Sequence, residues 1–383
     1  MEKQNKILVA MSGGVDSAVS ALLLKKQGYD VTGVNMRVWE YPEQCDSHAK
    51  SCCSPEDIQD AGKSALSLDI PFYVMKMERE FREKVIDRFI LDYASRRTPN
   101  PCVECNTYIK FGSLFEKARA LGIPLIATGH YAKTRLLDNG RWCVENGLDE
   151  KKNQAYYLYG LTQDAIASTI FPLGNLTKPE VRTLAAENNI AVAEKKESQE
   201  ICFIPQNDYR DFLKKENFAF TPGSFRSRNG QLLGEHDGSE KFTIGQRRGL
   251  GVSSANPLYV IAVQHDGDVI LGEVADTGVQ ELTVEQINFQ GMDPEKFIKD
   301  FSKQPFRCRI QIRYRSRPTA AEIQYLGYSV AASWNGSPEG HRIHVRMLEE
   351  VHSAAPGQSA VFYPEEEDSD LSGIVLAGGL IAL

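Results

Sequence analysis

The chain has 383 residues, of which 42 % are hydrophobic and 25 % are charged, the proportions of an ordinary water-soluble protein. This length predicts two or three domains. The sequence contains no run of 18 or more apolar residues, which excludes an ordinary membrane-spanning helix. The net charge of −7 does not indicate a nucleic-acid-binding protein, although a sum over the whole chain can hide a local basic surface.

Eight cysteines occur in a chain for which we expect a cytoplasmic location. The first residues are polar and lead directly into an apolar stretch, so we expect no signal peptide. A framework of structural disulfides is not expected in a reducing compartment, which leaves some of the thiols as candidates for chemistry or metal binding. The eight are Cys45, Cys52, Cys53, Cys102, Cys105, Cys143, Cys202 and Cys308.

The first third of the chain alternates strand patterns with helix patterns. We expect strands at 6–11, 31–37, 71–76 and 123–128, and helices near 16–27, 56–68, 78–95 and 108–121. Ser54 and Pro55 are typical of a helix start, and Gly28 and Gly122 of helix ends. This alternation predicts an α/β fold with a doubly wound parallel sheet, in which ligands bind beyond the carboxyl ends of the strands.

The first strand runs into the segment Ser12-Gly13-Gly14-Val15-Asp16-Ser17, directly before the first helix. The glycines allow a tight turn that brings backbone N–H groups close to an anion, and the helix adds its positive end. Ser12 and Ser17 supply hydroxyl donors, while Asp16 would repel phosphate unless Mg²⁺ lay between them. No lysine follows the glycines, which excludes the kinase and GTPase loop. The segment is similar to the pyrophosphate loop of enzymes that adenylate a substrate oxygen; a plain strand-to-helix turn is the alternative.

Two further segments fall at carboxyl ends of predicted strands, Asn35-Met36 and Thr128-Gly129-His130. Met36 has the shape to pack on an adenine ring, and Gly129 would let a nucleotide approach closely. Simple packing is the alternative for both residues.

A second dense signal is the segment 98–106, which reads Thr-Pro-Asn-Pro-Cys-Val-Glu-Cys-Asn. Its two X-Pro units predict a rigid, extended loop, after which Cys105 lies near the start of a helix whose dipole favours the thiolate. Cys202 lies far along the chain, in the segment 198–204. Three interpretations compete: buried structural cysteines, a zinc site, which requires four ligands, and sulfur transfer from a persulfide. Sulfur transfer suits an adenylating domain, because adenylation turns an oxygen into a leaving group.

The pattern changes after about residue 205, where turn signals separate short segments. The stretches 258–264 and 269–273 flank a His-Asp-Gly-Asp turn and predict a hairpin. Short strands expected at 308–314, 320–327, 329–334, 341–348, 358–363 and 373–383 predict a small β-barrel. We therefore expect a first domain at 1–204, a small mixed domain at 205–284 and a C-terminal β-barrel at 285–383.

The segment 307–317 carries five arginines and no acidic residue. Alternation of Arg309, Gln311, Arg313 and Arg315 with apolar residues predicts a strand with one basic face in water and one apolar face on a core. Arginine suits phosphate, so a nucleic-acid partner with salt-dependent affinity is one interpretation. A solvated face without a ligand is the other.

Together these segments resemble the bacterial tRNA-specific 2-thiouridylases over nearly the whole length of the chain. The resemblance implies an ATP pyrophosphatase fold and replacement of O2 of the wobble uridine by sulfur. It also implies ATP and Mg²⁺ as cofactors, the tRNAs for Lys, Glu and Gln as substrates, and a persulfide donor from a cysteine desulfurase or sulfur relay. The matching segments are 10–17, 97–101, 105–106, 127–131, 176–182, 198–204, 242–251, 313–315 and 356–363.

The resemblance also implies roles for individual residues. Cys202 would accept the persulfide sulfur, and Cys105 would be the second catalytic cysteine, able to form a disulfide with it; Asp16 would be required for ATP turnover. We expect no dedicated protein metal site. The residues implied for ATP are Ala10, Met11, Ser12, Gly13, Gly14, Val15, Asp16, Ser17, Met36 and Gly129. Those implied for the target base are Asn100, Pro101 and Cys102. Those implied for the rest of the tRNA are His130, Lys152, Asn153, Gln154, Arg313, Tyr314 and Gln358.

One position departs from the family pattern, which reads Asn-Pro-Asp where this chain has Cys102. The acid–base role of that aspartate is therefore in doubt here. With Cys105 and Cys202, Cys102 would give three thiolates, enough to hold an iron–sulfur cluster, although we favour persulfide chemistry. Two further hypotheses stay open. One is a different ATP pyrophosphatase, such as an amidotransferase partner or an argininosuccinate synthase-like ligase. The other is an inactive tRNA- or nucleotide-binding module.

Overall fold

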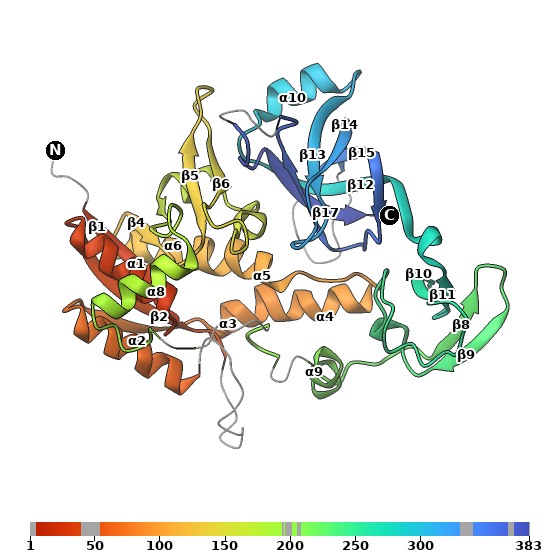
Figure 1. Ribbon diagram of the computed structural model, residues 1–383, viewed down its shortest axis with the longest axis horizontal. Helices are drawn as coiled ribbons and strands as arrows, with labels where there is room; N and C mark the ends of the chain where they lie inside the picture. Colours follow the sequence, from red (N-terminus) through yellow and green to blue (C-terminus); the bar gives the residue numbers. More distant parts are fainter. Residues whose placement is uncertain are drawn as a thin grey trace. The chain divides into compact units, whose positions relative to one another are not determined.

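The computed structural model describes residues 5–39, 54–193, 195, 201–204, 208–329, 340–366 and 371–382 (Figure 1). The chain divides into two compact units. Unit 1 comprises Met1–Asp87, Pro101–Asp208 and Gly373–Leu376, and unit 2 comprises Arg88–Asn100, Tyr209–Ser372 and Ala377–Leu383. The expectations for Cys45, Cys52, Cys53 and residues 198–200 lie outside the described residues.

Unit 1 is built on a five-stranded sheet in the order β3-β2-β1-β4-β7, with every neighbouring pair parallel. The central strand β1 is apolar, and its Ile7 and Val9 side chains are fully buried. This order confirms the predicted doubly wound parallel sheet. The strands are β1 (Lys6–Ala10), β2 (Asp30–Arg37), β3 (Phe72–Lys76), β4 (Leu125–Ala127) and β7 (Thr169–Ile170).

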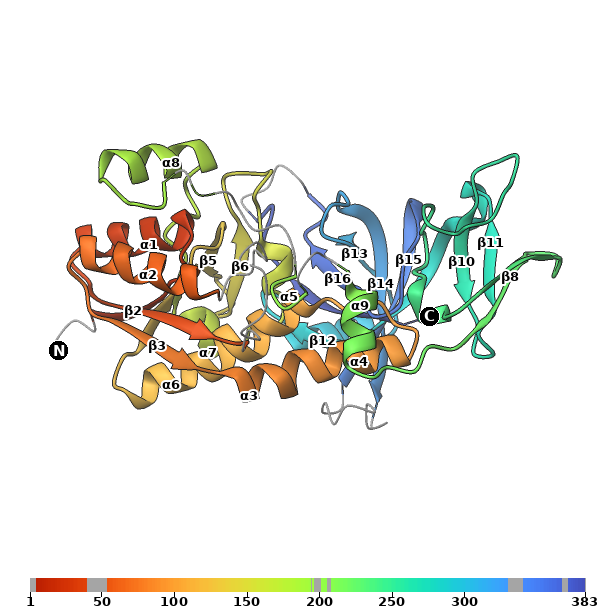
Figure 2. The ribbon, with the colours of Figure 1, turned by 90° about the horizontal axis from the view of Figure 1, so that it is seen from below.

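Helices cover both faces of this sheet (Figure 2). On one face, α1 (Val15–Lys26), α2 (Pro55–Ser67) and α8 (Lys178–Glu187) share a single hydrophobic core with β1. The predicted start of α2 is confirmed, because the Ser54 hydroxyl accepts the Asp57 N–H at 3.1 Å.

Two longer helices, called composite helices here, each consist of consecutive α-helical and π-helical segments. The predicted helix near 108–121 begins earlier than expected, at Pro101, whose fixed φ suits a first helical turn. Residues 101–106 are therefore helical, which corrects the extended loop expected there, and Cys105 is the fifth residue of the composite helix, near its start. The parts are α3 (Glu78–Phe81), η1 (Arg82–Ile86) and α4 (Asp87–Ala94), then α5 (Pro101–Glu104), η2 (Cys105–Ser113) and α6 (Leu114–Ala120).

The rest of unit 1 contains an antiparallel hairpin that the sequence did not reveal. It consists of β5 (Ala132–Leu136) and β6 (Trp142–Asn146), and it is followed by short helices. Those helices are η3 (Ala155–Leu158) and α7 (Gln163–Ala167).

Unit 2 contains a four-stranded sheet in the order β10-β11-β8-β9. The predicted hairpin is confirmed, since β10 and β11 are antiparallel around the His-Asp-Gly-Asp turn. Helix α9 packs on α4 through stacked Tyr93 and Tyr209 rings, whose centroids are 4.7 Å apart. The elements are α9 (Tyr209–Lys215), β8 (Gly223–Ser227), β9 (Leu232–His236), η5 (Ser239–Lys241), β10 (Tyr259–Val263), β11 (Val269–Gly272) and η6 (Val274–Thr277).

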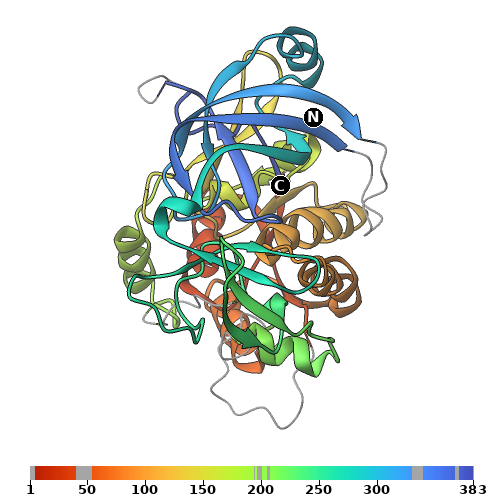
Figure 3. The ribbon, with the colours of Figure 1, turned by 90° about the vertical axis from the view of Figure 1, so that its right-hand side faces the viewer.

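The predicted C-terminal barrel is confirmed, and it is closed in the order β12-β15-β14-β13-β16-β17. Its blue strands curve around a common interior in Figure 3. The first strand begins at Gly278, earlier than the sequence suggested, and the expected strand at 329–334 lies outside the described residues beyond Ser329. The elements are β12 (Gly278–Phe289), α10 (Pro294–Phe301), β13 (Phe306–Gln311), β14 (Thr319–Ser329), β15 (Gly340–His352), β16 (Ser359–Tyr363) and β17 (Ala377–Ala382).

Across the described ranges of the chain, none of the helices is both long and apolar enough to cross a lipid bilayer.

Candidate functional site

The Ser12–Ser17 loop connects β1 to α1 at the carboxyl edge of the sheet. Gly13 has a φ of +77°, in the left-handed region that glycine adopts without strain. A Cβ at Gly13 would overlap the Asp57 carbonyl oxygen, so the loop is pressed against the start of α2. Helix α1 begins after Gly14, which supplies no side-chain cap. The first N–H groups of α1 are therefore oriented to meet an anion.

Polar side chains of the protein hold the carbonyl oxygens of this loop. Each of these contacts fixes the plane of one peptide unit. The three hydrogen bonds run from Asn35 Nδ2 to Met11 O (2.8 Å), from Lys195 Nζ to Gly13 O (3.1 Å) and from Ser17 Oγ to Gly14 O (3.0 Å). Ser17 Oγ also accepts the Ser12 N–H at 3.2 Å, so the Ser17 hydroxyl shapes the loop. Its donation to phosphate stays a prediction.

Asp16 at the first turn of α1 is paired with a buried lysine. Lys178 Nζ lies 2.7 Å from Asp16 Oδ1 and 2.8 Å from Oδ2, and the Tyr131 hydroxyl donates to Oδ1 at 2.8 Å. Lys178 is 7 % exposed and Tyr131 3 % exposed. Lys178 was not among the residues expected at the site, although it lies in the Leu-Thr-Lys-Pro-Glu-Val-Arg segment at 176–182.

The start of α8 fixes the position of Lys178. Thr177 donates both its backbone N–H and its hydroxyl to Glu180 Oε2, each at 2.7 Å. The Lys178 N–H donates to Asp149 Oδ2 at 2.9 Å. These helix-start contacts hold the lysine in the first turn of α8, from which its side chain reaches Asp16.

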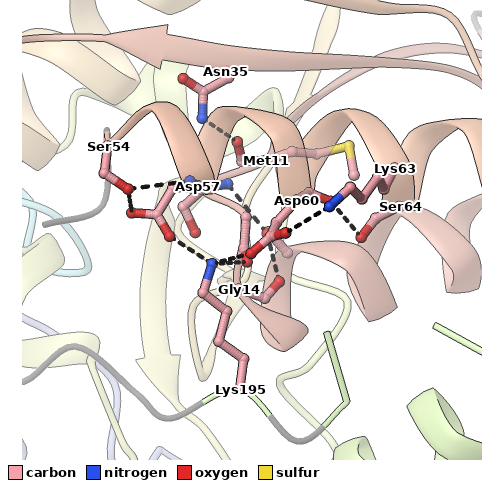
Figure 4. A network of polar contacts seen from close by, with 12 residues as sticks. Met11, Gly14, Asn35, Ser54, Asp57, Asp60, Lys63, Ser64 and Lys195 are labelled. Carbon is pink, nitrogen blue, oxygen red and sulfur yellow. Dashed lines mark hydrogen bonds and ion pairs between the residues drawn. The ribbon is translucent and has the colours of Figure 1, made fainter. Parts of the chain in front are cut away.

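A second lysine, Lys195, also contacts the loop (Figure 4). Lys195 Nζ is 2.6 Å from Asp57 Oδ1 and 2.6 Å from Asp60 Oδ2, both on α2. Burial lowers the pKa of Lys195, but the hydrogen bonds to the two aspartates outweigh it, so the pKa lies above its ordinary value. Lys195 is therefore charged at neutral pH.

The structure brings the expected Gly129 to the same loop. A Cβ at Gly129 would lie 2.9 Å from the backbone nitrogen of Ser17 and 2.9 Å from the carbonyl carbon of Asp16. This position therefore accommodates only glycine. On the neighbouring strand β2, Asn35 is buried and Met36 is half-buried. The contact of Met36 with adenine stays a prediction.

The oxygen ligands at the loop suit a Mg²⁺ ion only if a bound nucleotide supplies further ligands. Mg²⁺ takes oxygen ligands and is usually bound by one or two carboxylates together with substrate phosphates. Asp16 is the carboxylate on the loop itself, and it is shared with Lys178. Among the residues that the structure describes, no three Asp, Glu, His or Cys side chains gather to hold a metal ion. ATP would have to bring the remaining oxygen ligands.

Exposure divides the described cysteines into two classes. Cys102 is exposed, and Cys105 and Cys202 are half-buried. Cys143 and Cys308 are buried, and burial raises the pKa of the Cys143 thiol to about 12 and that of Cys308 further. A thiol with so high a pKa is a poor nucleophile, so Cys102, Cys105 and Cys202 are the better candidates for a reactive cysteine within this set.

Buried neighbours hold the two predicted catalytic cysteines. Phe203, next to Cys202, is 1 % exposed and packs edge-on against Phe81 with ring centroids 5.6 Å apart. Cys105 opens η2, a π-helical segment of a kind often found at functional sites. The side chain of the following Asn106 donates to Tyr157 O at 3.1 Å. The iron–sulfur cluster at Cys102, Cys105 and Cys202 stays a hypothesis.

The comparisons with known proteins identify the family. Residues 5–206 match the family described as "tRNA methyl transferase HUP domain", residues 210–272 its PRC-barrel domain, and residues 279–381 the "Aminomethyltransferase beta-barrel domain". The tRNA-specific 2-thiouridylase MnmA of Leptospira interrogans is 54 % identical, over 99 % of this chain and 96 % of that protein. The chain belongs to the tRNA-specific 2-thiouridylase family. The protein of the same name from Geotalea uraniireducens is 43 % identical, over 99 % of this chain and 95 % of its own length.

The residues of unit 1 that we expected to contact tRNA are well packed. His130 is 8 % exposed, with Nδ1 2.6 Å from Thr128 Oγ1 and its ring beside Phe111 and Phe171. Burial, assisted by the charge of Lys110, holds the pKa of His130 well below its ordinary value, so its ring is neutral. Its contact with tRNA stays a prediction.

The polar segment Lys152–Gln154 is also tied into the fold of unit 1. The Gln154 N–H donates to Tyr131 O, and the Tyr131 N–H donates to Gln154 Oε1, both at 3.0 Å. Asn153 Oδ1 accepts the Ala155 N–H at 3.1 Å. These contacts place the segment beside Tyr131 and thus near Asp16.

The expected arginine ladder of this 2-thiouridylase-family chain is wrong beyond Gln311. Strand β13 ends there, because Gln311 Nε2 donates to Tyr314 O and Ser316 O and closes a turn. Arg313 and Arg315 therefore lie on an exposed turn rather than on one face of a strand. Elsewhere in unit 2, Gln358 Nε2 donates to the carbonyls of Thr98 and Pro99, at 3.1 and 3.2 Å. Gln358 thus holds the backbone just before Asn100.

Proposed function

We propose that the protein catalyses the ATP-dependent 2-thiolation of the wobble uridine (U34) of tRNA. Uridine O2 is adenylated and then replaced by sulfur from a persulfide on Cys202, with release of AMP and pyrophosphate. The observation that carries this proposal is the loop at the N-terminus of α1, whose carbonyls are held by Asn35, Lys195 and Ser17. The names of the relatives and the HUP domain match support the same activity.

In the first half-reaction, O2 of the uridine attacks the α-phosphorus of ATP and the bond to pyrophosphate breaks. The loop N–H groups and the start of α1 would bind the phosphates and stabilise the charge that develops on them. Bound Mg²⁺ would neutralise part of the pyrophosphate charge, with Asp16 as the carboxylate that holds it. Lys178, released from Asp16, would then be a cation available to the phosphates.

In the second half-reaction, the terminal persulfide sulfur on Cys202 attacks C2, and the C2–O bond breaks as AMP leaves. The product is a disulfide link between Cys202 and C2. The Cys105 thiolate then attacks the Cys202 sulfur, which forms a Cys105–Cys202 disulfide and leaves the second sulfur on C2. A dithiol reductant restores both thiols before the next persulfide is loaded. The half-buried state of both residues supports this assignment over the buried Cys143.

The tRNA substrate has to present an unstacked base. A wobble uridine lies in a single-stranded anticodon loop, whose bases can be turned out at modest cost. Enclosure of the flipped base would also exclude water, which would otherwise hydrolyse the adenylate. We expect the acceptors for Lys, Glu and Gln and a persulfide relay as the sulfur source, on the basis of the family.

In vitro thiolation tests this function. Anaerobically purified protein, ATP, Mg²⁺, a persulfide source and unmodified tRNA-Glu transcript should yield 2-thiouridine at position 34, measured by nucleoside mass spectrometry. Cys202→Ser and Cys105→Ser should each abolish the product, and Cys143→Ala is the matched control that should retain it. Thiolation by Cys202→Ser would contradict the assignment. ATP turnover that needs no tRNA would indicate a small-molecule ligase, and tRNA binding without AMP release would indicate a binding module.

A further inference from the structure

Lys195 joins three parts of unit 1 that are far apart in the sequence. Its ammonium contacts the Gly13 carbonyl of the loop and the carboxylates of Asp57 and Asp60 on α2 (Figure 4). Lys195 itself belongs to the segment that leads to Cys202. One side chain therefore links the candidate anion site, helix α2 and the part of the chain that carries the candidate persulfide cysteine.

The contacts of Lys195 use the full capacity of its ammonium. A lysine side chain has three N–H donors, and three acceptors lie within 3.1 Å of Nζ. Two of the acceptors are carboxylates, which more than balance the single positive charge. Lys195 therefore adds no net positive charge for a phosphate, so its effect on an anion would come from geometry rather than from its own charge.

The geometry that it controls is that of the Gly13–Gly14 peptide. In a planar trans peptide the C=O of one residue and the N–H of the next point in opposite directions. Because Lys195 holds Gly13 O, the Gly14 N–H points away from Lys195. Gly13 has a φ of +77°, a left-handed conformation that glycine adopts without strain. The orientation of this peptide therefore depends on the glycine and on the contacts that hold its carbonyl. A hydrogen bond to the carbonyl also polarises the peptide and strengthens the N–H as a donor.

We propose that Lys195 is a positioning residue for the nucleotide phosphates. It holds the Gly13–Gly14 peptide so that the Gly14 N–H is presented to the phosphate chain of ATP, and it does so from the segment that carries Cys202. The inference rests on the proposed function, because it requires that this loop binds ATP. It adds a residue outside the expected set and explains why α2 lies against the loop.

Equilibrium binding to the full chain tests the proposal. The probes are α,β-methylene ATP with Mg²⁺ and, separately, adenosine, which has no phosphates, both followed by titration calorimetry. Lys195→Met should weaken binding of the ATP analogue about tenfold, the effect of losing one charge-assisted hydrogen bond. Adenosine binding should stay unchanged, because adenosine lacks the phosphates that the Gly14 N–H would contact. Lys195→Arg, which can still donate to Gly13 O, should recover most of the loss.

Lys63→Met is the matched control. Lys63 also pairs with Asp60, at 3.7 Å, but its side chain is 63 % exposed and reaches Asp60 from within α2. Its replacement should leave binding of both probes unchanged. The variant Asp60→Asn distinguishes two roles of Lys195: orienting the Gly13–Gly14 peptide, or binding the phosphate directly. It should weaken binding of the analogue if Lys195 acts through Gly13, and would strengthen it if Lys195, once released, bound phosphate itself.

Three results would overturn the proposal: unchanged binding of the analogue by Lys195→Met, an equal loss of adenosine binding, or tighter binding of the analogue by Asp60→Asn. Each of them leaves the proposed function standing, since the wild-type chain still binds ATP. If the wild-type chain binds α,β-methylene ATP no more tightly than adenosine, the phosphates add no affinity. The adenylation step of the proposed function then fails together with the role of Lys195.

Discussion

The ion pair between Asp16 and Lys178 should couple the stability of α1 to that of α8. Both carboxylate oxygens lie within 2.8 Å of Nζ, and the side chains are 30 % and 9 % exposed. Exposed pairs contribute roughly 0.2–1 kcal/mol, whereas removing one partner of a fully buried pair costs about 3–5 kcal/mol. The intermediate burial and two-oxygen geometry of this pair place its interaction energy at about 2 kcal/mol.

A double-mutant cycle measures this energy. The free energy of unfolding in urea is determined for the wild type, Asp16→Asn, Lys178→Met and the double variant. The double variant should lose about 2 kcal/mol less than the sum of the single losses, because each single change leaves an unpaired charge or amide. The single change Asp16→Asn should be the more costly, since Lys178 is the more deeply buried partner and loses its ion pair with Asp16.

The pair Lys25–Asp69 provides the control on the same helix. Its atoms are 3.5 Å apart, and its side chains are 42 % and 101 % exposed. The corresponding cycle should give a coupling below about 0.5 kcal/mol. An Asp16–Lys178 coupling no larger than that of the control would refute the reasoning, because burial and geometry would then have added nothing.

Two further predictions concern a glycine and a buried acid. Gly129→Ala should weaken ATP binding and cost about 1–3 kcal/mol of stability, because its Cβ would lie 2.9 Å from the backbone of α1. Gly62→Ala on α2 is the control: its Cβ would lie 3.6 Å from the Phe72 ring, an ordinary contact, so calorimetry and thermal unfolding should show a neutral or stabilising change. Burial raises the pKa of Asp92 from 3.8 to about 6, against the opposing charges of Arg88 and Arg97. The native state therefore favours the protonated acid, so stability is full below about pH 4 and falls by up to about 3 kcal/mol as the pH rises through 6. Asp92→Asn should remove this fall in urea unfolding measured across that range, and an unaltered pH slope would count against the assignment.

The sheet and the loop of unit 1 were predictable because their signals are local. Apolar runs predicted the ends of β1, β2 and β3 to within one residue and those of β4 to within two, and the Gly-Gly sequence identified the turn into α1. The Ser54 cap of α2 was equally local, since the hydroxyl and its N–H partner are three residues apart.

The two lysines at the loop were not predictable, because their partners are distant in the sequence. Lys178 meets Asp16 across 162 positions, and Lys195 meets Gly13 across 182. Only the packing of α8 and of the Lys195 segment beside the loop creates these contacts. The periodicity of the sequence cannot reveal such contacts. The Leu-Thr-Lys-Pro-Glu-Val-Arg segment, which matches the family, was the one signal that could have pointed to a role for Lys178.

The prediction of a strand through Arg313 and Arg315 was wrong for a different reason. Alternation of polar and apolar residues shows which side chains share a face, but not where a strand ends. Here the end is set by the Gln311 side chain, which binds Tyr314 O and Ser316 O and turns the chain before Arg313 completes a ladder. The barrel itself was predictable, because its core residues recur with strand spacing.

The most direct test of the central claim follows one sulfur atom. The protein is loaded with isotopically labelled persulfide on Cys202, freed of excess donor and mixed with tRNA-Glu transcript for a single turnover with or without ATP and Mg²⁺. The account predicts labelled 2-thiouridine at position 34 only when ATP is present, with AMP and pyrophosphate formed in equal amounts. Label that reaches the uridine without ATP, or that is transferred by Cys202→Ser, would contradict it.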